Sequence, residues 1–275
     1  MTSGSLNNVR PAPLGNVRRI RGHDSRGVGK RSEATVGGNT PGSLSRNSSS
    51  SNVHPLSCAS DMCLRDEMDA ILKRNKEWLY WRWPRPDHPT FRSAPKAAAL
   101  LLDAVGPESR ILCMRDRCLR PVRELALERG NPLIVPSRDG NMVYTLPQSA
   151  IYSRDGQRRS LSIEPLPEGS RRYAGQIDVV VIGCLAWNRF ETRLYSFDTE
   201  RTASVLMGLY EGLSNGFRLA PSVPVLCVAA DCQEVAGWPD SALGYVEATG
   251  VVTPTRIVAF GDGVLLYPQV ANLHE

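Results

Sequence analysis

The run IDVVVIG, from Ile177 to Gly183, constrains the fold of this 275-residue chain more than any other segment. After Asp178 no polar residue interrupts the run, and most of its members are Ile or Val. A strand with one solvated face alternates polar and apolar residues, whereas an unbroken β-branched run is typical of a parallel strand with both faces covered by helices. The run therefore predicts an α/β protein with a mainly parallel sheet.

Helical and strand patterns alternate on both sides of this run. Helical spacing of apolar residues predicts helices over 64–79, 94–105, 120–130 and 199–216, the first stopped by the prolines of WLYWRWPRP and the last capped by Gly216. Short apolar segments predict strands in SRILCM, NPLIVP, MVYTLP, VPVLCVAA, GVVTP, RIVAF and VLLY. The alternation predicts βαβ units, and so a three-layer, Rossmann-like open sheet with helices on both faces.

Composition divides the chain into a tail and a domain. Residues 1–57 are rich in Ser, Gly, Asn and Arg and hold eight Lys and Arg against two Asp and Glu. Such a segment cannot bury enough apolar surface to offset its chain entropy, so we expect a disordered tail followed by one domain over 58–275. The arginine-rich tail also fits a mitochondrial or plastid transit peptide, and a simple extension of a cytoplasmic protein is the alternative.

The charge, the hydropathy and the cysteine content of the chain limit the kinds of partner and ligand that we expect it to bind. Outside the tail the chain carries 25 basic and 26 acidic residues, which argues against a surface that binds nucleic acid. No window approaches 18 consecutive apolar residues, so we expect no membrane span. The seven cysteines form no Cys-x-x-Cys pair and there are only four histidines, so we expect no metal site. Cys184 and Cys227 lie in apolar strands and are interpreted as core residues.

Six segments carry a family resemblance through their joint order along the domain. They are PRPDHPTFRSAPKAA, ILCMRDRCLRPVRELAL, LIVPSR, IDVVVIGCLAW, ADCQEV and GVVTPTRIV. In this order they resemble the 5-formyltetrahydrofolate cyclo-ligase family (methenyltetrahydrofolate synthetases), in its divergent cyclo-ligase-like branch. The resemblance implies a cyclo-ligase type of Rossmann-like sheet and the ATP-dependent conversion of 5-formyltetrahydrofolate to 5,10-methenyltetrahydrofolate, a ligase reaction of one-carbon metabolism. It also implies ATP and Mg²⁺ as cofactors and a folate-like ligand.

One connection, ETRLYSFDTERT, departs from the family pattern. The family places there a glycine-rich nucleotide loop, whose backbone N–H groups close on phosphates beside a helix N-terminus. Arg193 and Leu194 match that loop. Its glycines and its metal-side aspartate are replaced here by Tyr195, Phe197, Thr199 and Thr202. We therefore expect ATP binding to be impaired or lost.

Two groups of residues are candidate ligand contacts. The candidates for binding nucleotide or phosphate are Arg65, Arg193 and Ser196. The candidates for binding substrate are Asp116, Arg123, Arg138 and Asp231. The second group stands at or shortly after the ends of predicted strands, where ligands bind in open α/β sheets. The structural alternatives are solvent-facing arginines and helix-capping aspartates. No catalytic residue is assigned, because no Ser-His-Asp or Cys-His set can be assembled.

The tryptophans of WLYWRWPRP allow two interpretations. Trp78, Trp81 and Trp83 could stack on a pterin or a base. Aromatic residues at a helix end more often anchor the helix on the sheet, and we expect core packing.

Three functions remain open at this stage, the third and weakest being another small-molecule enzyme on the same fold. The first is the family's ATP-dependent cyclo-ligase reaction. The second is a non-catalytic protein on the same fold that binds a small molecule or acts as a scaffold. The glycine-free connection favours the second, and the sequence leaves the oligomeric state open.

Overall fold

The structure of this chain is a computed structural model, which describes residues 61–79, 90–152, 156–157, 161, 163–189, 193–195, 199–214, 216–236 and 245–260. The predicted tail, residues 1–57, and the predicted strand VLLY lie outside the described residues. None of the helices in the described ranges is long and apolar enough to cross a membrane.

Helices of two kinds flank the strands. The α-helices of the described ranges are α1 (Asp61–Arg74), α2 (Ala94–Val105), α3 (Arg120–Arg129) and α4 (Thr199–Glu211). The short 3-10 helices are η1 (Arg117–Leu119), η2 (Gln148–Ile151) and η3 (Asp231–Gln233). Both η1 and η3 follow a strand closely, so they lie where strands of the sheet end.

Within the described residues, the main sheet has eight strands in the order β11-β10-β8-β5-β1-β2-β3-β4. Their bounds are β1 (Ile111–Cys113), β2 (Leu133–Pro136), β3 (Val143–Thr145), β4 (Arg171–Arg172), β5 (Val179–Gly183), β8 (Val225–Val228), β10 (Gly250–Val252) and β11 (Ile257–Ala259). Strands β10, β8, β5, β1 and β2 run parallel, and β3, β4 and β11 add antiparallel pairs at the two sides. The prediction of an α/β protein with a mainly parallel sheet is confirmed.

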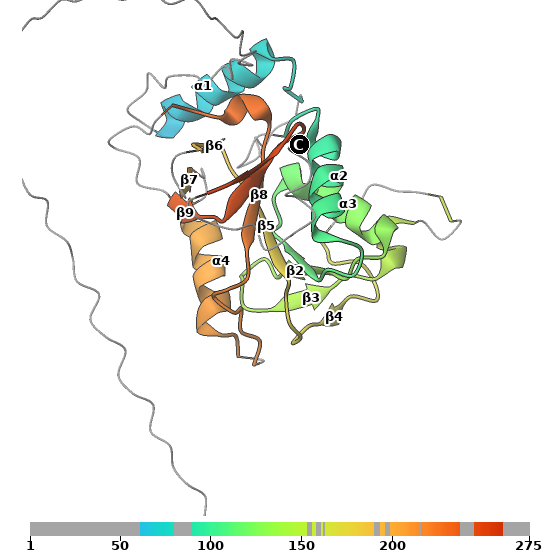
Figure 1. The fold of residues 1–275 in the computed structure, drawn as a ribbon. Coiled ribbons are helices and arrows are strands. Elements are labelled where there is room, and N and C mark those ends of the chain that lie inside the picture. The colour runs from blue at the N-terminus through green and yellow to red at the C-terminus, as the bar shows by residue number, and fades with distance from the viewer. Residues whose placement is uncertain are drawn as a thin grey trace, which may run out of the picture. The chain divides into compact units, whose positions relative to one another are not determined.

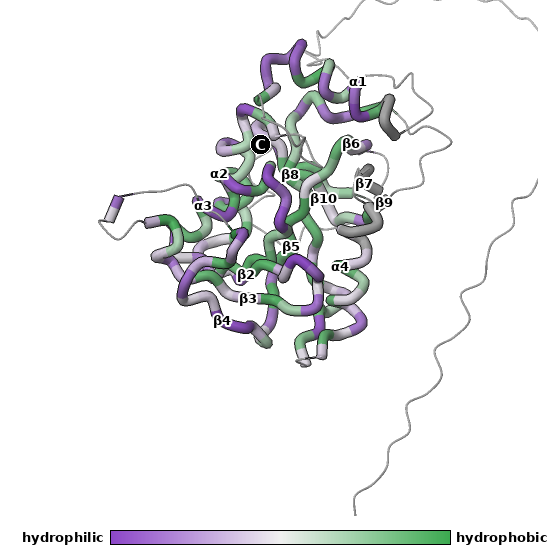
Figure 2. Tube along the Cα trace, turned by 180° about the vertical axis from the view of Figure 1, so that it is seen from behind, coloured by the Kyte–Doolittle hydropathy of each residue, from purple (hydrophilic) through white to green (hydrophobic). Residues whose placement is uncertain are grey.

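Helices cover this sheet on both sides. Helix α2 contacts β8 and β10, and α3 contacts α2 and β2. Helix α4 lies across the sheet from α2 and α3 (Figure 1). All five residues of β5 are buried, and the central strands are hydrophobic along the tube (Figure 2). The unbroken apolar run in the sequence is thus the centre of the core, as predicted.

A second, smaller sheet has the order β6-β7-β9 and lies beside α4. Its strands are β6 (Ala186–Trp187), β7 (Arg193–Tyr195) and β9 (Tyr245–Glu247), paired antiparallel. The sequence analysis did not predict this sheet. Its strands are two or three residues long, too short for an alternating pattern to show.

Two predicted helix ends are wrong. Helix α1 ends at Arg74 instead of reaching residue 79, because Lys76 adopts a positive φ of 58° and Trp78 N–H turns back to donate to Leu72 O at 3.1 Å. Helix α4 ends at Glu211, because Gly212 adopts a positive φ of 106° and stops it one turn before Gly216. A positive φ favours glycine, and a helix commonly ends where it occurs.

Candidate functional site

The connectivity of the sheet marks one place for a ligand. From β1 the chain crosses through α3 to β2 on one side, and later returns to β5 on the other side of β1. The order then continues through β8 to β10, so the direction of winding reverses between β1 and β5. Ligands of open α/β sheets bind outside the carboxyl ends of the strands at such a reversal. We call the side of the sheet where β1, β2, β5, β8 and β10 end the carboxyl edge, and the opposite side the amino edge.

Asp116 lies at this reversal. It follows β1, and its Oδ2 accepts a hydrogen bond from the backbone N–H of Gly183, the last residue of β5, at 3.3 Å. It makes no side-chain cap of η1, the alternative that the sequence left open. The carboxylate therefore joins the ends of the two strands between which the winding reverses.

Arg123 has backbone partners here, and it is only 3% exposed. Its Nη1 donates to Met114 O at 2.7 Å and to Asp116 O at 3.0 Å. Its Nε is buried with no hydrogen-bond partner among the described residues. The guanidinium thus holds the connection between β1 and η1 from inside the domain.

Four cysteines lie near this reversal and are buried. They are Cys113, Cys118, Cys184 and Cys227. Burial raises the pKa of the Cys113 thiol to about 11, although Arg123 lowers it in part. Burial also raises the pKa of Cys118 and of Cys227 well above the ordinary range, so all three stay protonated at neutral pH. Cys184 and Cys227 are core residues, as predicted. Within the described ranges, no group of three His, Cys, Asp or Glu side chains could hold a metal ion.

The turn η3, which follows β8, connects several segments of the carboxyl edge. Gln233 is buried; its Oε1 accepts from Ala230 N–H at 2.7 Å, and its Nε2 donates to Cys184 O at 3.2 Å and to Leu185 O at 2.9 Å. Asp231 Oδ1 accepts from Thr255 Oγ1 at 2.6 Å. Helix α1 packs against η3, so it covers this part of the edge (Figure 1).

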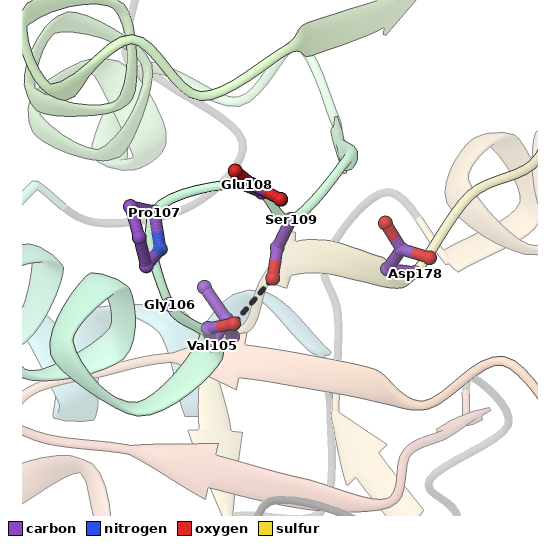
Figure 3. A pocket seen from close by; sticks show the side chains of 6 residues that line it. All are labelled: Val105, Gly106, Pro107, Glu108, Ser109 and Asp178. Carbon is purple, nitrogen blue, oxygen red and sulfur yellow. Dashed lines mark hydrogen bonds between the residues drawn. The ribbon is translucent and has the colours of Figure 1, made fainter.

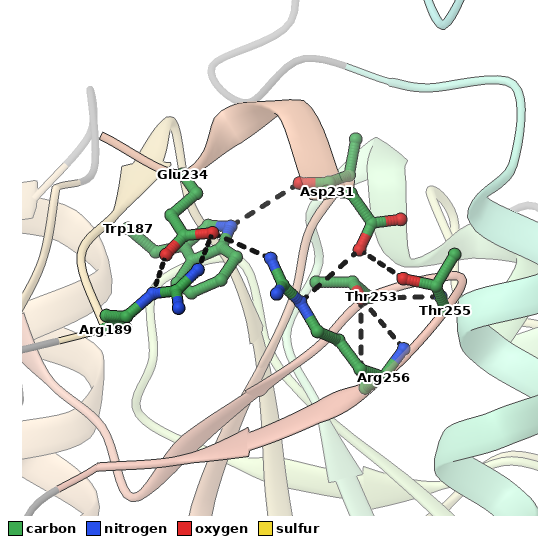
Figure 4. Close-up of polar contacts among 8 residues, drawn as sticks. Trp187, Arg189, Asp231, Glu234, Thr253, Thr255 and Arg256 are labelled. Carbon is green, nitrogen blue, oxygen red and sulfur yellow. Dashed lines mark hydrogen bonds and ion pairs between the residues drawn. The ribbon is translucent and has the colours of Figure 1, made fainter. Parts of the chain in front are cut away.

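Next to η3, one buried carboxylate binds two arginines (Figure 4). Glu234 accepts hydrogen bonds from Nε and Nη2 of Arg189, the second at 2.8 Å, and from Nη2 of Arg256 at 2.7 Å. The side chain of Glu234 is 2% exposed, whereas those of Arg189 and Arg256 are 33% and 28% exposed. The hydrogen bonds to Glu234 raise the pKa of the Arg189 guanidinium. We call these three residues the Glu234 cluster.

Two neighbours fix Arg256 further. Its guanidinium carbon lies 5.6 Å from the centre of the Trp187 ring, and the Trp187 Nε1 donates to Ala230 O at 3.4 Å (Figure 4). Its backbone joins a turn around Thr253, whose Oγ1 donates to Arg256 O at 3.1 Å and accepts from Arg256 N–H at 3.2 Å. The arginine is therefore held from both its backbone and its side chain.

The other predicted contacts are spread along the chain. Arg65 is buried on α1, and Arg138 is exposed in the turn after β2. Arg193 is in β7, but only its backbone is described, and Ser196 lies outside the described residues. The structure brings Asp116 and Arg123 together and places Asp231 at the carboxyl edge with the Glu234 cluster. Trp78 packs partly buried against the core, as predicted, whereas Trp81 and Trp83 lie outside the described residues.

An open surface pocket lies at the amino edge instead (Figure 3). It is lined by Val105, Gly106, Pro107, Glu108, Ser109 and Asp178. Asp178 is occupied by Arg110, which donates from Nε at 2.8 Å and from Nη2 at 2.6 Å. This bidentate hydrogen bonding lowers the pKa of Asp178. Because the pocket is at the wrong edge for a ligand of such a sheet and its carboxylate is paired, it is a poor candidate.

The sequence analysis missed the Glu234 cluster. Glu234 and Arg256 lie within two of the segments that carry the family resemblance, ADCQEV and GVVTPTRIV. Glu234 follows a predicted strand, and Arg256 is the first residue of the predicted strand RIVAF, just after the predicted strand GVVTP. Their positions beside strand ends are the signal that could have found them. Arg189 lies outside those segments, and only the folded chain brings it to Glu234.

No family model matches this chain, and no curated protein matches it. The resemblance to the cyclo-ligase family therefore stays a prediction from the sequence.

Proposed function

We propose that this chain is a 5-formyltetrahydrofolate cyclo-ligase-like protein that binds a folate-like small molecule at its carboxyl edge and has lost ATP-driven turnover. The observation that carries the proposal is the convergence of the segments on which the resemblance depends. Asp116 bonds to Gly183, and Gln233 bonds to Cys184. Arg256 bonds to Glu234. Four segments far apart in the sequence thus build one edge, at the position where such sheets bind ligands.

The backbone of β7 supports the loss of the ATP site. Phosphate loops bind their ligand with free backbone N–H groups. Arg193–Tyr195 form the middle strand of the small sheet, where Tyr195 is paired with Ala186 on one side and with Tyr245 on the other. The start of the connection is therefore engaged in strand pairing, with no glycine to let a phosphate approach.

One position argues against Mg²⁺ bound together with ATP. A magnesium ion bound with a nucleotide takes one or two carboxylate ligands. Among the described carboxylates of this edge, Glu234 is already bound by two arginines. The family's metal-side aspartate is Thr202 here, and its side chain is buried on α4.

Two measurements on the full chain test the proposal. Calorimetry with 5-formyltetrahydrofolate should show binding heat that saturates at one molecule per chain. The same sample with ATP and Mg²⁺ should form no 5,10-methenyltetrahydrofolate, as followed by its absorbance. Turnover above about 1 s⁻¹, a rate usual for enzymes, would refute the loss of catalysis. No heat with any folate would refute the ligand and favour a scaffold.

A further inference from the structure

The two arginines of the Glu234 cluster have hydrogen-bond donors that Glu234 does not use. Arg189 binds the carboxylate through Nε and Nη2, and Arg256 through Nη2. Within the described part of the chain, the Nη1 atoms of both have no hydrogen-bond partner. Nε of Arg256 is buried without a partner, and the side chains of Arg189 and Arg256 as a whole are 33% and 28% exposed.

The contacts around the cluster leave these donors available to an anion. Two guanidinium groups share the single carboxylate of Glu234, and Asp231 is a longer ion-pair partner of Arg256, with its Oδ1 3.8 Å from Nε, too far for a hydrogen bond. It also accepts from Thr255. Among the described contacts, neither Nη1 group makes a hydrogen bond with Glu234 or Asp231.

We propose that Arg189 and Arg256 form a carboxylate-binding pair at the carboxyl edge. In this pair the Nη1 groups bind one carboxylate of the ligand, and Glu234 is a positioning residue that fixes the spacing of the two guanidinium groups. The Trp187 ring beneath Arg256 keeps its plane in place. Arginine suits this task because its planar fork meets a carboxylate with two hydrogen bonds.

The identity of the full ligand rests on the proposed function, because the glutamate portion of a folate carries such carboxylates. The anion site itself can be tested without a folate. Glutarate, a small dicarboxylate, is the first probe, and inorganic phosphate and 5-formyltetrahydrofolate are the second and third. Binding is measured on the full chain by calorimetry and by the rise in melting temperature with ligand concentration.

The variants are Arg189→Lys and Arg256→Lys, which keep a positive charge beside Glu234 and so preserve the fold better than a neutral residue. Each removes the Nη1 donor and the planar fork. We expect each to weaken glutarate binding about tenfold or more, the effect of losing one charge-assisted hydrogen bond. The matched control is Arg110→Lys, since Arg110 makes a similar bidentate contact with Asp178 at the amino edge. It should bind glutarate as the wild type does.

The outcomes separate this inference from the proposed function. Glutarate binding that depends on Arg189 and Arg256, without any folate binding, supports the pair and refutes the folate ligand. Folate binding that is equal in wild type and in both lysine variants supports the proposed function and overturns the pair. Binding of phosphate in preference to glutarate overturns the assignment to a carboxylate, and binding of none of the three probes overturns both.

Discussion

Replacing Glu234 by Gln tests how far the carboxyl edge depends on one buried carboxylate. The change keeps the size of the side chain and removes the negative charge that two arginines share. Removing one partner of a fully buried ion pair costs about 3–5 kcal/mol of unfolding free energy. The side chains of Arg189 and Arg256 are 33% and 28% exposed, so water can solvate part of each guanidinium. We therefore expect Glu234→Gln to cost about 2–3 kcal/mol.

Thermal and urea unfolding of the full chain measure this loss. In a domain of this size, 1 kcal/mol corresponds to about 2–4 °C, so the melting temperature should fall by about 4–12 °C. The control is Asp178→Asn. Asp178 also binds an arginine in a bidentate way, but the two side chains are 34% and 36% exposed, and water can replace the lost bonds. Equal shifts for the two variants, or a Glu234→Gln protein that melts with the wild type, would refute the reasoning.

A double-mutant cycle assigns the loss to the pair itself. Arg256→Gln alone and together with Glu234→Gln should give a coupling free energy of about 1–2 kcal/mol, since the two side chains are in direct contact. Coupling near zero would mean that Glu234→Gln acts through the local backbone. In that case the contact seen in the structure would not explain the stability of this edge.

Three further predictions concern the rest of the chain. The thiol of Cys113 has a pKa of about 11 in the folded protein, and its ordinary value is 9.0 in the unfolded chain. Its contribution to the free energy of unfolding is therefore complete below pH 9 and is lost as the pH rises to 11. Urea midpoints should fall across that window, and less steeply in Cys113→Ala. The buried Cys118 and Cys227 should resist maleimide labelling until urea unfolds the chain, and fast labelling of the native protein would contradict their burial. Deleting residues 1–57 should leave the melting temperature unchanged; a fall of several degrees would show that the tail docks on the domain.

The sequence predicted the elements whose pattern is long or unbroken. Helix α2 has the predicted bounds, and β5 is the fully buried central strand that its β-branched run indicated. Both follow from local sequence alone, since burial on two faces or along one helical stripe determines which residues are apolar. The ends of α1 and α4 depend instead on the backbone conformation of Lys76 and Gly212, which apolar spacing does not encode.

The candidate site was predictable only in part. The positions of Asp116 and Asp231 follow from where strands end, so the sequence could place them at the carboxyl edge. The partners of Arg123 could not be predicted, because a buried arginine that bonds to backbone carbonyls looks in sequence like one that faces a ligand. The Glu234 cluster draws on three separate segments, and which arginine meets Glu234 depends on the path of β6 and β11.

The contacts at the carboxyl edge bear on how much a family resemblance can say about catalysis. Most residues of η3, and Glu234 next to it, form hydrogen bonds with a different segment of the chain. Asp231 bonds to Thr255, Gln233 bonds to Cys184 and Leu185, and Glu234 bonds to the two arginines. A protein that keeps this edge must keep Gln233 and Glu234, which are buried, to avoid buried polar groups without partners. The family's glycine loop has another purpose, since it serves a nucleotide and not the packing of the edge. A chain can therefore lose that loop and retain the segments that carry the resemblance. Likeness in those segments predicts the fold and a site at this edge, whereas the proposed loss of turnover rests on the connection from Arg193 to Thr202, where the sequence departs from the pattern of the family that it resembles.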